Sequence, residues 1–198
     1  MSDVVISIKG ASVSYREDVA LQDVSLEVRR GEFVGIIGPN GAGKTTLLTI
    51  VNGLGKLVQG QGTVLGIRLN GKSGSKLRKR IGYVAQVENI DARLPINVRE
   101  TVMVGNYGRL GLLHWPKRAQ WEEVDRMLDL VGIAHLSQRP IGHLSGGEYQ
   151  RAAIARAIVQ EPEIFLLDEP TASVDERAQR ELLNLIQLIH RKFGMTTL

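Results

Sequence analysis

The chain has 198 residues, 43% of them hydrophobic and 23% charged, with no cysteine and a formal net charge of +4. This composition predicts a globular protein held together by packing in a reducing cytosol, and it excludes a disulfide framework and a thiolate metal site. The apolar runs are too short for a membrane-spanning helix, the N-terminus has no signal-peptide pattern, and the positive charge is mostly spread along the chain as solvated surface.

The N-terminal third has the pattern of an antiparallel sheet. Residues 4–9, 13–15 and 24–28 alternate apolar and polar side chains, which favours strands with one buried face. Residues 53–74 contain many glycines and short β-like stretches, so we expect hairpins at an edge of the sheet. The sequence thus begins with a predicted β subdomain.

Two continuous apolar runs have a different pattern. Residues 33–37 and 164–167 contain no polar side chain, as in strands that are buried on both faces of a parallel sheet. Residues 81–84 predict a further strand, and residues 44–51 predict a short buried helix after a glycine-rich turn. This order of strand, turn and helix is typical of an α/β fold.

Helical spacing dominates the middle and the end of the chain. Apolar side chains recur at intervals of three and four in residues 97–132, and residues 148–159 and 176–192 show the same spacing. Residues 195–198 have the pattern of one more strand. The sequence therefore predicts a helical insertion between the strands of the core.

We predict one domain, residues 1–198, with two lobes. No internal repeat, low-complexity tract or long linker divides the sequence. Residues 1–93 and 162–198 are expected to form the α/β core with its β subdomain. Residues 94–161 are expected to form the helical subdomain.

The segment after the first apolar run, Gly38-Pro-Asn-Gly-Ala-Gly-Lys44-Thr45, fits the P-loop pattern. Glycines let the backbone wrap around phosphate oxygens, the lysine reaches the β- and γ-phosphates, and the threonine hydroxyl binds Mg²⁺. The helix predicted directly after this turn would point its N-terminus at the bound anion. A glycine-rich turn with a chance lysine is the alternative for this motif alone.

Two acidic residues follow the second apolar run. Asp168 suits a ligand of Mg²⁺, usually through water, and Glu169 suits a base that polarises the attacking water. An apolar strand that ends in Asp-Glu is a weak signal by itself. The long stretch of sequence between Lys44 and Asp168 favours a P-loop protein whose two halves are separated by a helical insertion.

The segment Leu144-Ser145-Gly146-Gly147-Glu148 distinguishes one family among the P-loop proteins. Its simplest interpretation is a capping box of Ser145 and Glu148, but capping does not require two glycines. Together with the P-loop and the acidic strand end, this segment resembles the signature of ATP-binding cassette (ABC) domains. The resemblance covers essentially the whole chain. It implies a P-loop NTPase (RecA-like) core, an antiparallel β subdomain, and an inserted helical subdomain that carries the signature.

The resemblance also implies the residues of the site. Glu169 corresponds to the catalytic base, with Gln86 and Lys44 also catalytic, and residues 172–175 correspond to the D-loop. Thr45, Gln86 and Asp168 would hold Mg²⁺ together with ATP. The nucleotide-binding residues would be Tyr15, which stacks on adenine, Gly38, Pro39, Asn40, Gly41, Ala42, Gly43, Lys44, Thr45 and Thr46, and, acting in trans, Ser145, Gly146, Gly147 and Asp175. Tyr15 and Gln86 taken singly could be ordinary strand residues, and the shared order of the motifs favours their functional interpretation.

Three features depart from the family pattern. Glu148 stands where glutamine is commonest, and the D-loop contains Ser-Val-Asp instead of Ala-Leu-Asp. In the family, a strand like residues 195–198 continues into a segment with a histidine that contacts the γ-phosphate. We therefore expect this chain to be truncated, so that it binds ATP but hydrolyses it poorly, while the parent protein is the enzyme. The four histidines present are expected to be surface or packing residues: His114, His135, His143 and His190.

The kind of cassette is predicted from its surroundings in the sequence. Residues 94–102 and 105–112, with Arg139-Pro-Ile-Gly before the signature, are similar to the zinc and manganese importer branch. The chain shows no fused membrane helix, tandem cassette or coiled coil. The resemblance therefore implies an ATPase subunit of a bacterial-type importer of metal ions (zinc, manganese or iron/chelate), cytoplasmic and peripheral on the inner face of the cell membrane.

The resemblance implies three kinds of partner: a second copy bound head to tail on ATP, integral membrane permease subunits, and indirectly a substrate-binding protein. The apolar residues Val102, Met103, Leu112 and Leu113 either line the groove that receives the permease or belong to the core. A nucleotide-dependent regulatory module without transport is one alternative. A nucleic-acid-linked ATPase is another, suggested by the positive net charge and the basic cluster from Lys76 to Arg80, although nucleic acid is the less favoured partner.

Overall fold

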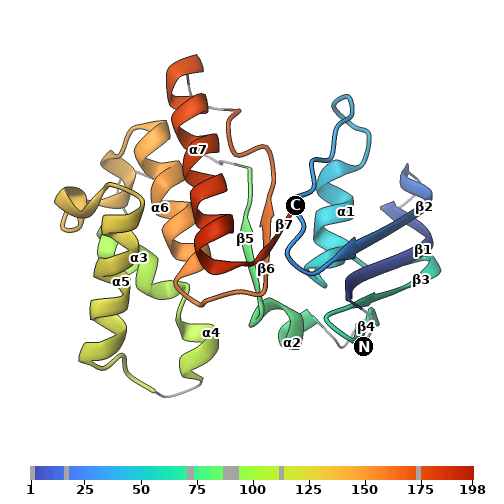
Figure 1. Ribbon diagram of the computed structural model, residues 1–198, viewed down its shortest axis with the longest axis horizontal. Coiled ribbons are helices and arrows are strands. Elements are labelled where there is room, and N and C mark those ends of the chain that lie inside the picture. The colour runs from blue at the N-terminus through green and yellow to red at the C-terminus, as the bar shows by residue number, and fades with distance from the viewer. Residues whose placement is uncertain (1–2, 16–17, 71–73, 87–93, 112–113, 173–174) are drawn as a thin grey trace.

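The computed structural model describes residues 3–15, 18–70, 74–86, 94–111, 114–172 and 175–198. Figure 1 shows an antiparallel sheet on the right, a parallel sheet in the middle and a group of helices on the left. The predicted α/β class is confirmed by this arrangement. No helix within the described ranges is long and apolar enough to cross a membrane.

The antiparallel sheet predicted near the N-terminus is confirmed. Alternate residues such as Ile6 and Ile8 are fully buried, whereas Lys9 is exposed, as the alternating pattern predicted. The short β3–β4 hairpin forms one edge of the sheet, where the glycine-rich stretch was expected to lie. The four strands are β1 (Val4–Tyr15), β2 (Asp18–Arg29), β3 (Gln59–Val64) and β4 (Ile67–Arg68), in the order β2-β1-β3-β4.

The parallel sheet consists of β5 (Ile81–Val84), β6 (Ile164–Leu167) and β7 (Thr196–Thr197), in that order. The helix α7 (Glu176–Phe193) connects β6 to β7, as required for a parallel pair. All three strands and the long helix were predicted from the sequence. The carboxyl end of β6 is therefore the point at which Asp168 and Glu169 leave the sheet.

The central strand β6 belongs to two apolar cores. Phe165 packs in the core formed with the helices, whereas Ile164 and Leu166 pack in the core formed with the antiparallel sheet. The helix α1 (Lys44–Val51) lies between the two sheets and joins the second core through residues such as Leu48 (Figure 1). A strand with both faces covered explains the continuous apolar sequence of β6.

The prediction of a doubly buried strand at residues 33–37 is wrong. Phe33 forms an isolated parallel bridge with Thr197, and the N–H of Val34 donates to the Thr197 carbonyl across 2.8 Å. Val34 and Ile36 pack against the core, but Phe33 is 48% and Ile37 98% exposed. The side chains of this segment therefore pack on one face only.

The predicted helical insertion is present between β5 and β6. Val102 and Met103 are 0% and 1% exposed, so they belong to the core and not to a docking groove, while Leu112 and Leu113 lie outside the described residues. The helices are α3 (Val98–Val104), α4 (Tyr107–Leu110), α5 (Arg118–Leu130) and α6 (Gly146–Ile158), with 3₁₀ turns at Ala134–Leu136 and Ile141–His143, and the short α2 (Gly74–Arg78) precedes β5.

The histidines occupy the places predicted for surface and packing residues. His190 is partly buried, with its ring edge-on to Phe33 at 5.1 Å and its Nδ1 3.1 Å from the hydroxyl of Thr197. The exposed ones are His114, His135 and His143.

Candidate phosphate-binding site

The glycine-rich turn at residues 38–43 leads directly into α1. Gly41 and Gly43 have φ angles of 81° and 86°, in the left-handed region that favours glycine. A Cβ on Gly43 would lie 2.5 Å from the carbonyl oxygen of Ala20, so a side chain does not fit there. Because the N-cap residue Gly43 provides no side-chain acceptor, the first N–H groups of α1 can bind an anion.

Lys44, Glu169 and Gln86 form a chain of polar contacts. The Nζ of Lys44 donates to the carbonyl oxygens of Gly38 and Pro39, across 3.0 and 3.1 Å, and lies 3.4 Å from Oε1 of Glu169. The Nε2 of Gln86 donates to Oε2 of the same carboxylate across 3.2 Å. The Glu169 carboxylate is thus placed between a lysine of the turn and a glutamine that follows β5.

One pocket of about 360 Å³ gathers most of these residues. Its lining combines backbone N–H groups, an ammonium group and hydroxyls, all of which donate hydrogen bonds to phosphate oxygens. Glu169 has a φ of 46°, a left-handed conformation that costs a non-glycine residue on the order of 1 kcal/mol and is concentrated at functional sites. The lining residues are Ala20, Asn40, Gly41, Gly43, Lys44, Thr45, Thr46, Gln86 and Glu169.

Asp168 is held by two hydroxyl groups from different elements. The Oγ1 of Thr45, at the start of α1, donates to Oδ1 across 3.0 Å, and the phenol of Tyr83 donates to Oδ2 across 3.2 Å. Asp168 is 2% exposed, so both contacts lie in a region of low dielectric. Burial, with the adjacent Asp168 charge, raises the pKa of Tyr83 to about 12, so the phenol keeps its proton and remains a donor at neutral pH.

Tyr83 is a site residue that the sequence analysis missed. It pairs with Leu166 across the β5–β6 ladder, and Asp168 follows two residues later on the same side of the neighbouring strand. A tyrosine three residues before Gln86 gave no signal by itself. Pairing residues 81–84 with residues 164–167 in parallel register would have placed it beside the acidic strand end.

The signature segment lies on the other side of the parallel sheet from α1 (Figure 1). Ser145 is the N-cap of α6 and forms a capping box with Glu148, so the simplest interpretation of this pair is confirmed as a structural fact. Within the described residues, the lining of the pocket around Lys44 does not include Ser145, Gly146 or Gly147. One copy of the chain therefore does not bring these residues to its own P-loop.

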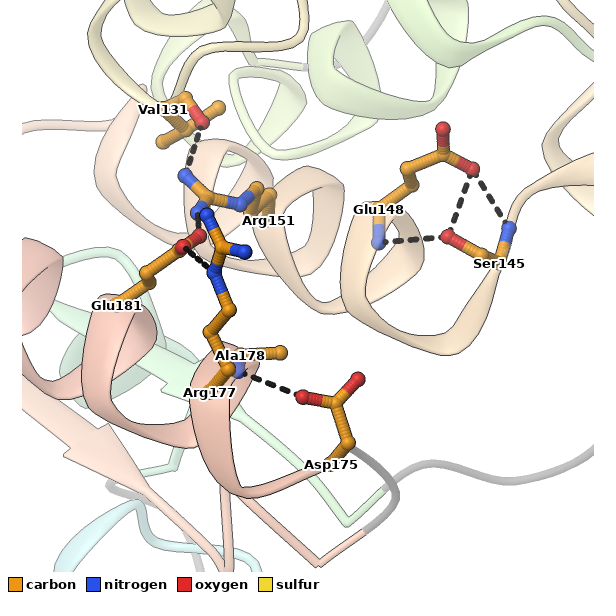
Figure 2. A network of polar contacts seen from close by, with 8 residues as sticks. All are labelled: Val131, Ser145, Glu148, Arg151, Asp175, Arg177, Ala178 and Glu181. Carbon is orange, nitrogen blue, oxygen red and sulfur yellow. Dashed lines mark hydrogen bonds and ion pairs between the residues drawn. The ribbon is translucent and has the colours of Figure 1, made fainter.

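A hydrogen bond joins α6, which begins at the signature, to α7, which begins after the D-loop (Figure 2). Asp175 is the N-cap of α7, where its carboxylate accepts from the N–H of Ala178 across 2.9 Å. From α6, Arg151 donates to Glu181 of α7 across 3.3 Å and to the carbonyl of Val131, at the end of α5, across 2.9 Å. Arg151 therefore fixes α6 relative to both of its neighbours.

Two predicted residues are only partly described. Tyr15 is the last residue of β1, paired with Asp18, but its side chain lies outside the described part of the structure. In the D-loop, residues 173 and 174 also lie outside it, whereas the N–H of Ala172 donates to the carbonyl of Glu169 across 3.1 Å. This backbone hydrogen bond to Glu169 therefore closes a turn at the start of the D-loop.

Residues 21–172 match the family model described as ABC transporter, a stretch that runs from β2 through the P-loop, the signature and Glu169. The chain belongs to the ABC transporter family. This cassette is 39% identical, over 193 residues, to the manganese transport system ATP-binding protein MntB of Bacillus subtilis, covering 98% of this chain and 75% of that protein. It is 37% identical to the phosphonates import ATP-binding protein PhnC of Caulobacter vibrioides, covering 98% of this chain and 77% of that protein.

The fold of the cassette agrees with a solved structure of the same family. A dimeric bacterial ABC transporter cassette superimposes with a TM-score of 0.84 at 29% identity, covering 97% of this chain and 85% of that one. The predicted fold is thereby confirmed, and with it the assignment of the chain as an ATP-binding and ATP-hydrolysing cassette.

Proposed function

We propose that this cassette is the ATPase subunit of an importer of metal ions, with manganese as the first candidate cargo. The observation that carries the ATPase chemistry is the convergence of Lys44, Glu169 and Gln86 on one pocket beside the Thr45–Asp168 pair. The relative named for manganese transport supports the cargo. The similarly close relative named for phosphonate import defines the competing outcome of the test.

In the proposed reaction, the P-loop amides and the ammonium group of Lys44 bind the phosphates of ATP and stabilise the charge that develops on the γ-phosphoryl group. The oxygen of the attacking water bonds to the γ-phosphorus while the bond from that phosphorus to the bridging oxygen of ADP breaks, so that ADP leaves. The Glu169 carboxylate accepts a proton from this water, and Gln86, hydrogen-bonded to that carboxylate, orients the water and the γ-phosphate. Asp168 and Glu169 both follow β6, and they contact Thr45 and Lys44 at the start of α1. A phosphate bound at the start of α1 would therefore lie close to both carboxylates.

Magnesium fits the oxygen groups of this site. Thr45 Oγ1 and Asp168 Oδ1 lie 3.0 Å apart, and hydroxyl and carboxylate oxygens are the ligands that Mg²⁺ prefers. Thr45, Asp168 and Gln86 would hold the ion. A bound ion would neutralise negative charge on the phosphates of ATP, while Tyr83 keeps the Asp168 carboxylate in place.

The proposed active form is a head-to-tail dimer on two ATP molecules. Because one copy does not bring Ser145, Gly146 and Gly147 to its own pocket, these residues of one subunit would contact the γ-phosphate held by the other, with Asp175 beside them. The similar cassette solved as a dimer supports this assembly. Integral permease subunits, a substrate-binding protein and a place on the inner face of the membrane complete the proposal.

The test is ATP turnover by the full-length protein reconstituted with its co-encoded permease in liposomes. The substrate-binding protein is added in separate reactions with Mn²⁺, Zn²⁺, Fe³⁺-chelate or a phosphonate. Stimulation and uptake with a metal, absent in the Glu169→Gln variant, are expected. Stimulation by the phosphonate alone would overturn the metal cargo, and turnover that never depends on the permease would overturn the transport function.

A further inference from the structure

The carboxylate of Glu148 binds its N-cap residue through both backbone and side chain. Its Oε2 accepts from the N–H of Ser145 across 2.7 Å and from the hydroxyl of Ser145 across 2.8 Å (Figure 2). In the other direction, the N–H of Glu148 donates to Ser145 Oγ across 3.4 Å. The hydroxyl contact is the one that an ordinary capping box does not need, because that motif requires only the two backbone donors.

The Ser145 hydroxyl donates its only proton to Glu148 Oε2. A serine hydroxyl has one O–H donor, and an ionised carboxylate can only accept. Phosphate oxygens are acceptors as well. Ser145 therefore cannot donate to Glu148 and to a γ-phosphate at the same time, and one acceptor displaces the other.

Glu148 is an anion under neutral conditions. Hydrogen bonds from the backbone N–H and then the hydroxyl of Ser145 lower the pKa of the Glu148 carboxyl, with a further contribution from the charge of Arg139. Its Oε2 lies 2.8 Å from the hydroxyl proposed to meet the γ-phosphate, so the two negative groups would become close neighbours. Both the competition for one proton and the like charges oppose binding of the phosphate.

We propose that Glu148 weakens ATP-driven closure of the cassette dimer by accepting the hydrogen bond of the Ser145 hydroxyl. That hydrogen bond must break before Ser145 can donate to the γ-phosphate held by the partner subunit. This inference rests on the in-trans role of Ser145 proposed above. A glutamine at the same position keeps an oxygen that can accept from Ser145, but it holds the hydroxyl more weakly because it carries no charge, and it offers an amide N–H₂ to the phosphate. Residue 148 therefore sets the ATP concentration at which two cassettes associate.

The test uses the full-length protein in a Glu169→Gln background, where ATP is bound but not consumed. The ATP concentration for half-maximal dimerisation is measured by sedimentation for this parent and for variants that add Glu148→Gln, Ser145→Ala, or both. Glu148→Gln is expected to lower that concentration about fivefold or more, the scale of one competing charge-assisted hydrogen bond. The same substitution in the Ser145→Ala background is expected to give a smaller gain, because only the repulsion between like charges is then relieved.

Glu122→Gln is the matched control, because it removes one carboxylate from the exposed face of α5 and should leave dimerisation unchanged. If Glu148→Gln leaves the ATP requirement for dimerisation unchanged or raises it, the proposed role of Glu148 is overturned. If Ser145→Ala abolishes dimerisation in the same experiment, the proposed in-trans site remains intact. Full dimerisation of Ser145→Ala would overturn both. Because glutamine also fits the capping box, the thermal midpoint of Glu148→Gln should match that of the parent, which separates this effect from a loss of folding.

Discussion

Tyr83, within β5, and Asp168, directly after the parallel neighbour β6, are joined by a hydrogen bond of 3.2 Å from the phenol to Oδ2. The other oxygen of the same carboxylate accepts from Thr45. Neither contact is local in sequence, and both orient the carboxylate proposed to bind the metal. The pair therefore gives the first prediction.

Replacing Tyr83 by Phe should lower the affinity of the nucleotide complex for Mg²⁺ or Mn²⁺ about tenfold, the lower end of the range for residues that orient a metal ligand. The ring and its packing remain, so the fold should not change. Competition of Mg²⁺ with Mn²⁺, followed by electron paramagnetic resonance with ATP present, measures the effect. Tyr107→Phe on the exposed helix α4 is the control, and equal metal affinities in the two variants would contradict the prediction.

Replacing Glu169 by Gln should reduce ATP turnover about a hundredfold or more, because the proposed base loses its ability to accept a proton. The amide keeps the size of the side chain, so ATP binding should survive and dimers should accumulate with ATP. Single-turnover phosphate release and size-exclusion chromatography measure the two effects. Glu161→Gln, which removes an exposed partner of Arg109, is the control, and normal turnover in Glu169→Gln would exclude the assigned base.

Gly43→Ala should abolish ATP binding and destabilise the fold by more than about 1 kcal/mol, because its Cβ meets the Ala20 carbonyl in addition to the strain of the positive φ. Gly66→Ala is an informative control. Gly66 has a φ of 76° but open space around the missing Cβ, so it should show the strain alone and bind ATP normally. Urea denaturation and titration with a fluorescent ATP analogue separate the two costs.

Arg151→Gln should destabilise the protein more than Glu181→Gln, because only the arginine also donates to the Val131 carbonyl. The two side chains are 27% and 52% exposed, so their coupling in a double-mutant cycle should be small, about 0.5 kcal/mol. Arg177→Gln removes the other partner of Glu181 and serves as the comparison. Equal losses in Arg151→Gln and Glu181→Gln would show that the Val131 contact contributes nothing.

The Arg80–Glu163 pair predicts a dependence of stability on pH. The hydrogen bond from Arg80, at 2.5 Å, and a further one from Arg30 lower the pKa of Glu163 in the folded protein. The contribution of this pair to the free energy of unfolding is therefore complete above the unfolded glutamate pKa of about 4.3. It is lost as the pH falls through the lower pKa of Glu163 in the folded protein. Glu163→Gln should cost about 0.5 kcal/mol at pH 7, since the pair is one-third exposed, and the difference should shrink in urea titrations below pH 4.

Local patterns predicted most of the fold. The helix at Lys44–Val51 has the predicted bounds, and the spacing of Leu182, Leu185, Ile186 and Ile189 predicted the buried face of α7. The prediction for residues 33–37 failed because an apolar run indicates only that the side chains favour burial, not that other elements cover both faces of the segment. The role of Tyr83 was missed for a related reason, since strand register is a property of two segments and not of one.

The position of β6 between two cores has a mechanical consequence for the cassette. Phe165 is fixed on one side and Ile164 and Leu166 on the other, so this four-residue strand cannot shift without disturbing the packing of both lobes. Glu169 follows it in a strained conformation. A change of charge at the γ-phosphate would therefore act on a single stiff support shared by the two apolar cores, and a shift of that strand would be felt by the packing of both at once.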